Sequence, residues 1–468
     1  MILKMKNKYY IPCLYLWLSL IPLLLSSCGI YGSYQRPEEI TAERLFRAPT
    51  LPNDTVPATD QNIATLSWQD FFSDPQLKGL IKTALERNAD IRIAQLGLEQ
   101  SKAALLSAKL GFLPNISAAP SGQYSYNTEV WSYNLPITAS WEIDLFGKLR
   151  NSLEQQKAQT RLAEAQTYLV QTNIIAAVAN SYYTLLALDA QIGVAEKTVA
   201  TWRENIRVLR LLKETGRVTE AAIAQAEAQT FGLLDVLAEL KTQRRVTENA
   251  LATLLHLPPQ QIERGSMDSE RIPHFDTDLG VPVDLLALRP DVQMAEERLV
   301  MAYYGANRAR ADFLPSIKLT ANGSWTNALG GVIVDPFTFV GNAIGSLFQP
   351  IFNNGRNIAQ LRIAKAKQKE ATIQFQQTLI AAGAEVSNQL YRIEAYRTKI
   401  DFRKKQLESL HQATDMTMKL MTLGNGTYLE VLTSQQQLLN AEMGSYADQL
   451  GLLQSHINLY KALGGGTR

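Results

Sequence analysis

The sequence predicts a mainly α-helical fold that also contains a few long β-strands, built from two copies of one plan. Three observations support this prediction. Distant segments of the chain align with one another, four long stretches contain no proline, and the segments between these stretches alternate apolar and polar residues. Runs rich in Ala, Leu, Gln, Glu and Lys favour helices, whereas strict alternation favours strands.

The internal repeat consists of three collinear matches, the first of which aligns Asp90 with Asp291 and FLPNI with FLPSI. The matches are NADIRIAQ (from Asn88) with RPDVQMAE (from Arg289) at an offset of 201, LFGKLRN (145–151) with IFNNGRN (351–357), and TGRVTEAAIAQAEAQ (from Thr215) with LGNGTYLEVLTSQQQ (from Leu423). Because the landmarks keep the same order in both halves, the chain is predicted to be an internal duplication.

Each half is therefore predicted to hold a helix, a hairpin of strands, and two long helices that meet at a glycine turn. Thr215-Gly216 and Gly424-Asn425-Gly426 are the predicted reversals. The predicted N-terminal segments are a lipoprotein signal peptide (1–27) and an extended segment (28–66). Repeat 1 has a first helix (67–114), a β-hairpin (115–146) and long helices (147–255), and a linker (256–284) follows it. Repeat 2 has a first helix (285–315), a β-hairpin (316–352) and long helices (353–462), and a C-terminal tail (463–468) ends the chain.

The N-terminus carries a targeting signal. Three lysines precede an apolar run from Ile11 to Leu25, which is too short and too early for a transmembrane span. The run ends in Leu-Ser-Ser-Cys, which resembles the bacterial lipobox and predicts that Cys28 is lipidated. The cysteine is followed by Gly29, and in this respect the chain resembles lipoproteins that are sorted to the outer membrane. The alternative is an ordinary signal peptide with an incidental cysteine.

Composition disfavours several classes of function. The only other cysteine is Cys13, inside the signal, so the mature chain should hold no disulfide and no thiolate metal site. A formal net charge of +2 gives no basic bias towards nucleic acid. The four histidines match no metal-binding spacing, and no nucleophile–His–acid order is evident. We therefore expect no enzyme activity and no cofactor beyond the lipid on Cys28.

The strands are predicted from alternation. The stretch 131–145 is apolar on one face and polar on the other, with Pro136 as its one break, and would form a strand of roughly 50 Å. Typical strands have only about 5–6 residues. The segments 115–127 and 316–327 alternate in the same way, and the Gly-rich stretch 337–349 supplies a fourth strand. Alternation of this kind also suits a soluble β-sandwich.

Four such strands leave a sheet with two unpaired edges, which cannot lie in lipid because each unsatisfied backbone group costs several kcal/mol there. The smallest membrane barrels have about eight strands, so several chains must pool their strands. Two chains would form a filled barrel, and three would form one with 12 strands and a lumen. Trp131, Trp141 and Trp325, with Tyr124 and Tyr126, are predicted to mark the membrane interfaces.

Motifs along nearly the whole mature chain resemble the TolC-type outer membrane efflux proteins, most nearly their OprM/NodT-like lipoprotein branch. The motifs are Cys28 with YQRP (34–37), WQDFFSDPQLKGLIKTAL (68–85), FLPNI, SWEIDLFGKLR (140–150), RPDV (289–292), FLPSI, PIFNNG (350–355), YLEVL (428–432) and INLYKALGGG (457–466). Together they are highly specific, whereas FLP alone would be weak.

The resemblance implies a homotrimer in the outer membrane of a Gram-negative bacterium, with a 12-stranded β-barrel continued by a periplasmic barrel of 12 helices. It also implies an equatorial region that includes the linker 256–284. Such proteins are exit ducts that dock a periplasmic adaptor and an inner-membrane transporter, often of the RND class, and carry out no chemistry. Two alternatives remain open: a duct for proteins or peptides, and a structural lipoprotein tether, for which the strands would have no use.

The resemblance also suggests gate residues. Glu430 falls where the family often has an acidic residue facing the pore, and three ionised copies at one level would favour cations. A solvated glutamate on an outer helix face is an equally good explanation. Gly426 and Thr433 lie where relatives often carry charged gate residues, and Met421 where an aromatic residue is common.

The predicted turns supply the remaining candidates. Gly216, Arg217 and Glu220, with Gly424 and Asn425, are predicted to form the helix tips that contact the adaptor. Arg150 and Arg356 follow strands at equivalent positions of the repeat. Their expected role is capping or ion pairing where the strands meet the helices, rather than contact with cargo.

Overall fold

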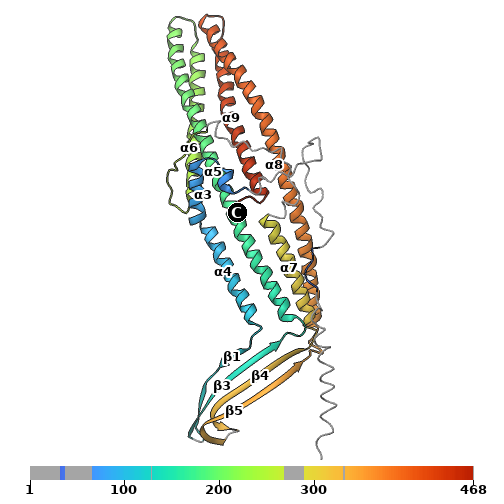
Figure 1. Ribbon diagram of the computed structural model, residues 1–468. Helices are drawn as coiled ribbons and strands as arrows, with labels where there is room; N and C mark the ends of the chain where they lie inside the picture. The colour runs from blue at the N-terminus through green and yellow to red at the C-terminus, as the bar shows by residue number, and fades with distance from the viewer. Residues whose placement is uncertain (1–31, 37–65, 128, 268–288, 330–331, 467–468) are drawn as a thin grey trace, which may run out of the picture. The chain divides into compact units, whose positions relative to one another are not determined.

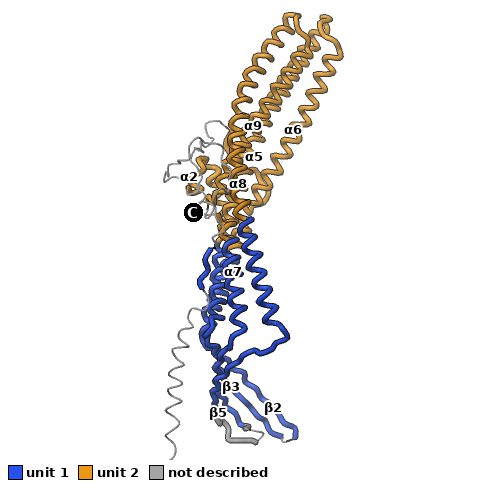
Figure 2. Tube along the Cα trace, turned by 90° about the vertical axis from the view of Figure 1, so that its right-hand side faces the viewer, with its two compact units in different colours: residues 1–41, 96–164, 294–377 blue, residues 42–95, 165–293, 378–468 orange. Residues whose placement is uncertain are grey.

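The computed structural model describes residues 32–36, 66–127, 129–267, 289–329 and 332–466. Cys28 and the second part of the predicted linker 256–284 lie outside these residues. The described chain is mainly helical with one small sheet, as Figure 1 shows, which confirms the predicted class. The chain divides into two compact units (Figure 2), which we describe separately: unit 1 comprises residues 1–41, 96–164 and 294–377, and unit 2 comprises 42–95, 165–293 and 378–468.

Helices of equal length recur in the two halves of the sequence. The pairs are α4 (Ala89–Leu110) and α7 (Pro290–Ala311) with 22 residues each, α5 (Lys148–Glu214) and α8 (Arg356–Thr422) with 67 each, and α6 (Glu220–Leu254) and α9 (Tyr428–Ala462) with 35 each. The structure thus repeats the helices of the duplicated sequence. Within the described ranges, no helix is both long and apolar enough to cross a membrane.

The first helical segment differs from the single helix expected over 67–114. It contains α2 (Trp68–Phe71), α3 (Pro75–Arg87) and α4. Asp74 caps α3, since its carboxylate accepts from the N–H groups of Gln76 (2.8 Å) and Leu77 (3.4 Å) ahead of Pro75 at the first helical position. Asn88 ends α3, and its Oδ1 accepts from Asp90 N at 2.9 Å to begin α4.

The sheet lies in unit 1 and is antiparallel throughout. Its strands are β1 (Asn115–Ala118), β2 (Ser121–Ser125), β3 (Val130–Ile143), β4 (Ser316–Leu329) and β5 (Val332–Phe348). The order is β1-β3-β4-β5, and β2 also pairs with β3. β1 and β2 pair with β3 in the same continuous register, so together they form one interrupted strand beside β3. The expected strand 115–127 is divided near Pro120. In the register of β1 and β2 on β3, Pro120 lies opposite Leu135 and Ala119 lies opposite Pro136. Neither proline has an N–H to donate to the ladder, so pairing is interrupted at this point.

Pairing across the sheet gathers like residues on each face. One face carries Trp131, Leu135, Ile137, Ala139, Trp141 and Ile143 of β3, Ile317, Leu319, Ala321 and Trp325 of β4, and Phe339, Ala343 and Leu347 of β5. The other face carries Asn134, Thr138, Ser140 and Glu142 of β3, Lys318, Thr320, Asn322, Ser324 and Thr326 of β4, and Asn342 and Ser346 of β5. β5 breaks the pattern, because Val340, Ile344 and Phe348 also lie on this second face. The sheet therefore has one apolar and one mainly polar face, as the alternation predicts.

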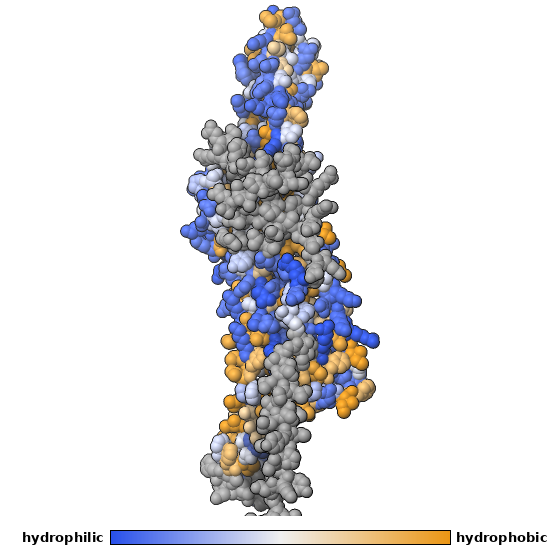
Figure 3. Space-filling model, turned by 45° about the vertical axis from the view of Figure 1, so that its right-hand side comes forward, coloured by the Kyte–Doolittle hydropathy of each residue, from blue (hydrophilic) through white to orange (hydrophobic). Residues whose placement is uncertain are grey.

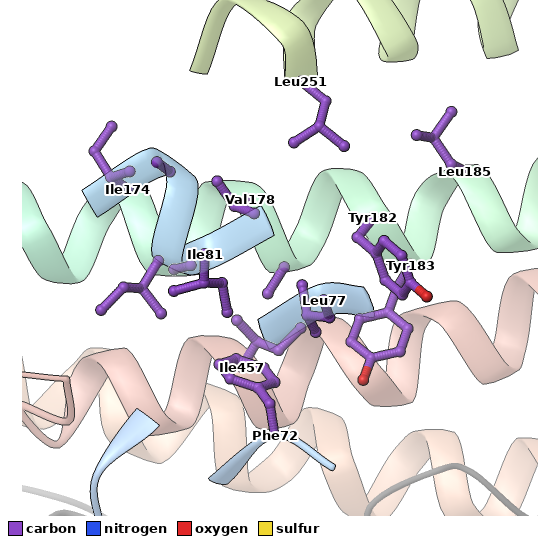
Figure 4. Packing of buried hydrophobic residues seen from close by; sticks show 14 of the residues in the cluster. Phe72, Leu77, Ile81, Ile174, Val178, Tyr182, Tyr183, Leu185, Leu251 and Ile457 are labelled. Carbon is purple, nitrogen blue, oxygen red and sulfur yellow. The ribbon is translucent and has the colours of Figure 1, made fainter. Parts of the chain in front are cut away.

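The largest apolar core lies in unit 2, where α2 and α3 pack against α5, α6 and α9 (Figure 4). Leu77, Ile81 and Leu251 are completely buried there. Tyr182 joins this core, and its hydroxyl donates to Asp74 Oδ2 at 2.6 Å. Burial and this bond raise the pKa of Tyr182 far above its ordinary value. The short helices thus fix the middle of unit 2.

Two buried arginines tie irregular segments to the helices of unit 2. Arg264, in the described part of the linker, pairs with Asp189 of α5 at 2.5 Å and with Glu248 of α6 at 2.7 Å. Arg289, which precedes α7, pairs with Asp291 at 2.8 Å and donates to the Ala462 carbonyl at the end of α9 at 2.5 Å. Because burial of an unpaired charge is costly, each arginine requires these partners.

Candidate functional site

The two predicted glycine turns of unit 2 have the same backbone geometry. Gly216 follows α5 with φ +73°, and Gly424 follows the last residues of α8 with φ +81°. In each turn the next residue closes a bond five residues back, from Arg217 N to Leu212 O and from Asn425 N to Leu420 O, both 3.0 Å. This is the Schellman pattern, which requires a left-handed residue and so favours glycine.

Side chains from both turns meet in one apolar cluster, so the predicted gate and helix-tip residues lie in the same region of unit 2. The cluster consists of Ile206, Leu209, Ile223, Ala226, Tyr428, Val431 and Leu432, with Val218, Ala222, Met418 and Met421 against it. Figures 1 and 2 both show the turn between α5 and α6 beside the turn between α8 and α9. Burial raises the pKa of Tyr428 in this cluster.

Glu430 lies in the first turn of α9 and is exposed. Its Oε2 accepts a hydrogen bond of 3.3 Å from the backbone N–H of Thr427, the residue before the helix. A carboxylate at this position satisfies a free N–H group and interacts favourably with the helix dipole. Glu430 therefore has a local capping role that the sequence analysis missed, although TYLE has the spacing of a capping box.

The other three predicted gate residues have different surroundings. Gly426 packs so closely on the end of α8 that an added Cβ would lie 3.1 Å from Met421 N. This close approach explains why glycine occupies position 426, independently of any role in a gate. Thr433 is exposed, and its hydroxyl donates to Leu429 O of the same helix at 2.8 Å. Met421 is half-buried against the apolar cluster.

The turn between α5 and α6 carries more charged side chains than the turn between α8 and α9. Glu220 pairs with Lys213 at 2.5 Å, and Arg210 pairs with Glu227 at 2.5 Å, so both ion pairs join α5 to α6. Arg217 is exposed. These charges, like Asn425 in the other turn, lie on the solvent-facing surface of the turns, where surface pairs contribute only ~0–1 kcal/mol each.

Several polar contacts that sequence reasoning missed join α5 to α9, two of which involve Asn205 and Gln191. Asn205 Nδ2 donates to Gln435 Oε1 at 3.3 Å, and Gln191 Nε2 donates to the Met443 carbonyl at 3.1 Å. Gln435 is only 8% exposed. The sequence held no signal for either contact, because amide side chains are common throughout these helices.

A buried carboxylate joins α8 to α9. Asp448 lies 2.7 Å from Lys399 and 3.0 Å from Arg403. Two glycines of α9 make room on this surface: an added Cβ at Gly444 would lie 3.0 Å from the Arg403 guanidinium, and at Gly451 only 2.3 Å from the Tyr396 ring. The spacing of these glycines, seven residues apart within a long helix, is the sequence signal that could have indicated this interface.

On the sheet of unit 1, the predicted interface aromatics occupy three levels of the apolar face. Trp131 contacts Tyr124, with ring centroids 5.4 Å apart. Trp325 pairs with Leu135 across the strands, and its ring contacts the Phe339 ring at an interplanar angle of 54°, with centroids 5.0 Å apart. Trp141 lies ten residues from Trp131 along β3. Hydrophobic residues, drawn orange in Figure 3, gather in the part of that view where the strands lie.

The FLP motifs of the two halves make matching junctions between helix and sheet. Trp141 Nε1 donates to the Phe112 carbonyl at 2.8 Å, and Gln349 Nε2 donates to the Phe313 carbonyl at 2.9 Å. Arg150 pairs with Asp144 at 3.4 Å, and the Asp144 carboxylate also accepts from Arg150 N at 2.9 Å. The junction role expected for Arg150 is thus confirmed, and the backbone N–H of Arg356 donates to Asn353 O at 3.1 Å where α8 begins.

Metal-ligating residues do not gather on the described part of the chain, where no group of three or more His, Cys, Asp or Glu side chains could hold an ion. The candidate site is therefore a pair of surfaces, namely the two-faced sheet and the helix turns.

Comparisons with known proteins identify relatives over nearly the whole chain. The family model described as "Outer membrane efflux protein" matches residues 80–256 and 281–465. The toluene efflux pump outer membrane protein TtgC of Pseudomonas putida is 30% identical over 470 residues, which cover 96% of this chain and 95% of TtgC. The probable outer membrane lipoprotein SilC of Salmonella typhimurium is 26% identical over 463 residues, which cover 96% of this chain and 98% of SilC.

The cation efflux system protein CusC of Escherichia coli O6:H1 is 29% identical over 460 residues, which cover 95% of this chain and 97% of CusC. A crystal structure of CusC superposes on 94% of this chain and 100% of its own, with a TM-score of 0.83 and 26% identity.

Proposed function

Because the chain belongs to the outer membrane efflux protein family, we propose that it is the outer membrane exit duct of a tripartite efflux system. In this role it passively conducts small molecules, such as drugs, from an inner-membrane transporter and a periplasmic adaptor to the exterior. The observation that carries the proposal is the sheet, which has one apolar face, one polar face and two edges without a partner strand among the described residues.

The direction of the strands supports closure of a barrel by several copies. The strand positions β1/β2, β3, β4 and β5 alternate in direction, so the two edges run antiparallel. β5 of one copy can therefore pair with β1/β2 of the next without breaking the alternation. Three copies with four positions each would give a homotrimeric barrel of about 12 strands, within the range of known membrane barrels.

The apolar face has a height suited to the outer membrane. Trp131 and Trp141 are ten residues apart, which corresponds to roughly 34 Å along an antiparallel strand. At a tilt of about 40° this length spans about 25 Å along the membrane normal, the height of the apolar band in such barrels. We place these two tryptophans at the two interfaces. Trp325 pairs with Leu135, between their levels, so we replace its predicted place at an interface with one inside the apolar band.

The polar face would line the lumen. Its charged residues among the paired positions of β3 and β4 are Glu142 and Lys318, which lie opposite one another. Hydroxyl and amide groups form most of the remainder on β3 and β4, and β5 adds the apolar side chains of Val340, Ile344 and Phe348. A lumen of this kind has little net charge and would pass solutes without strong preference for their sign.

The helix turns of unit 2 are the proposed periplasmic end. We assign adaptor contact to the exposed turns around Gly216, Arg217 and Glu220 and around Gly424 and Asn425, and an RND-type transporter as the inner-membrane partner. The gate would involve Glu430. The duct would need no cofactor and catalyse no reaction, and its one attached group would be the lipid on Cys28, as the name of SilC suggests for that relative.

Electrical recording of the purified protein in a planar bilayer tests this proposal. Discrete current steps, from protein that migrates as a trimer on unheated gels, are the expected result. A monomer without current steps would contradict the duct and favour a tether. Mass spectrometry of the N-terminal peptide tests the lipid on Cys28 separately.

A further inference from the structure

Residues 32–36 of unit 1, which we call the strap, lie against α7. The Tyr303 hydroxyl donates to the Gly32 carbonyl at 2.9 Å, and the rings of Tyr34 and Tyr303 meet edge to face with centroids 5.8 Å apart. Arg36 binds Glu296 through two nitrogens, at 2.9 Å from Nε and 2.5 Å from Nη2. A bidentate pair fixes orientation as well as proximity.

The strap also contacts α8. The Arg36 guanidinium carbon lies 5.6 Å from the centre of the Phe375 ring, which is fully buried. An arginine above an aromatic face gains a further attraction. A hydrogen bond, an ion pair, an edge-to-face ring contact and a cation–π contact therefore hold the five residues of the strap against two helices.

The internal duplication shows that the partners of the strap are peculiar to the second half. At the offset of 201, Glu296 corresponds to Gln95, and Tyr303 corresponds to Lys102. The equivalent positions of α4 therefore carry neither the carboxylate nor the aromatic ring. Only α7 is equipped to bind the strap, which explains this difference between two otherwise matching helices.

The strap lies at a suitable distance from the predicted lipid site. Cys28 precedes Gly32 by four residues, and four residues of chain span at most ~14 Å. Tyr303 precedes Ala311, the last residue of α7, by eight residues, or ~12 Å of helix. A lipidated Cys28 can thus reach the level at which α7 ends and the chain enters β4, but little beyond it.

We propose that the strap is the docking element of the lipid-anchored N-terminus. Arg36 and Tyr34 are its positioning residues, and they hold the acylated Cys28 at the base of the sheet while the strands enter the membrane. If the strap bound two turns closer to the start of α7, the distance to that level would grow by ~11 Å, and the lipid would fall ~9 Å short of it. The inference rests on the proposed function, since it requires both the lipid and a membrane-inserted sheet.

Charge reversal with rescue tests the strap. Arg36→Glu and Glu296→Arg are each expressed alone and together, and the fraction of trimer in the outer membrane is measured on unheated gels. We expect each single variant to lower this fraction about two- to five-fold, the range set by one well-oriented exposed pair. The double variant, which restores the pair in reverse, should recover it.

The same variants are then made with Cys28→Ala behind an ordinary cleavable signal peptide. If the strap acts by positioning the lipid, the strap variants should have no further effect in this lipid-free background. The matched control is the neighbouring bidentate pair of Arg161 with Glu297, at 2.6 and 2.8 Å, which joins α5 to α7 without the strap. Arg161→Glu should act equally in both backgrounds.

Equal losses from Arg36→Glu with and without the lipid would overturn the inference and leave the strap a structural contact. Unchanged trimer in the lipidated protein, or an unmodified Cys28 in the wild type, would overturn it as well. Conductance of the wild-type trimer separates this inference from the proposed function. A conducting trimer that is indifferent to the strap variants would refute the strap alone, and a wild type without conductance would refute the duct.

Discussion

Asn205 of α5 donates a hydrogen bond of 3.3 Å to Gln435 of α9, beside the apolar cluster that joins the two helix turns. The bond links the hairpin of α5 and α6 to the hairpin of α8 and α9. Its acceptor Gln435 is buried, so this amide cannot exchange Asn205 for water without a change in the packing. If the hairpins part when the duct opens, this bond must break.

Asn205→Ala should therefore favour the open duct. A side-chain hydrogen bond contributes about 1 kcal/mol, so loss of this bond should raise the open probability of single channels about five-fold. Gln437→Ala, an exposed change two residues further along α9, is the control and should leave the open probability unaltered. A lower open probability for Asn205→Ala would show that the bond does not restrain opening.

Glu430→Gln should reduce the preference of the open pore for cations, because it removes one negative charge from each copy at one level. The measurement is the reversal potential in a salt gradient. The neutral side chain still accepts a hydrogen bond from Thr427 N, so the start of α9 should lose well under ~1 kcal/mol of stability.

Glu220→Gln is the matched control, since Glu220 lies in the first turn of α6 and Glu430 lies in the first turn of α9. A reversal potential that responds equally to both substitutions would indicate a general surface charge. No response to Glu430→Gln would remove Glu430 from the pore wall and leave it only the capping role.

Alanine at Gly216 or Gly424 should destabilise the turns, because each glycine has a positive φ. The expected cost is ~1–2 kcal/mol per site, which thermal unfolding in detergent can measure. Gly193, in the middle of α5, has nothing within 4 Å of an added Cβ. Gly193→Ala should instead stabilise the protein by about 0.5–1 kcal/mol. Equal effects at all three glycines would contradict the assigned turn geometry.

Asp291→Asn should destabilise the protein at neutral pH but not in acid. Burial disfavours the charged form, yet the hydrogen bond and attraction from Arg289 prevail and hold the pKa of Asp291 below its ordinary value of 3.8. Its stabilising contribution is therefore complete above the unfolded pKa of about 3.9 and disappears as the pH falls through the lower folded pKa.

Chemical unfolding at several pH values measures this difference. At pH 7 the variant should lose about 1 kcal/mol relative to the wild type, because the Asp291 side chain is 34% exposed and Arg289 keeps its pair with Glu385 at 2.7 Å. The gap should close as the pH falls below the unfolded pKa and through the lower folded pKa of Asp291. A gap that stays constant with pH would show that the charge of Asp291 is not the source of its contribution.

Sequence patterns predicted the helices and the two-faced sheet because their signals are periodic. Alternation identified β3 and β4, and the absence of proline identified the 67-residue helices. The break between β1 and β2 depends on Pro120 meeting the neighbours of Pro136, which is visible only once the register is known.

The site was harder to predict because its contacts are non-local. Asn205 and Gln435 are 230 positions apart, and Arg36 and Glu296 are 260 apart. No periodic pattern records such pairs. Gly426 illustrates a second difficulty: a turn glycine and a glycine that replaces a gate residue look alike in sequence, and only the close approach to Met421 N shows the structural reason.

Disulfide cross-linking of the two sheet edges tests most directly whether the sheets of several copies close into a barrel. Ser117→Cys on β1 is combined in turn with a cysteine at Asn342, Ile344 or Ser346 of β5, all on the polar face. Closure by three copies predicts that one combination gives covalent dimers and trimers, with no larger species and no product from either single cysteine. Products that stop at the dimer, continue beyond the trimer, or do not form in any combination would contradict the trimeric duct.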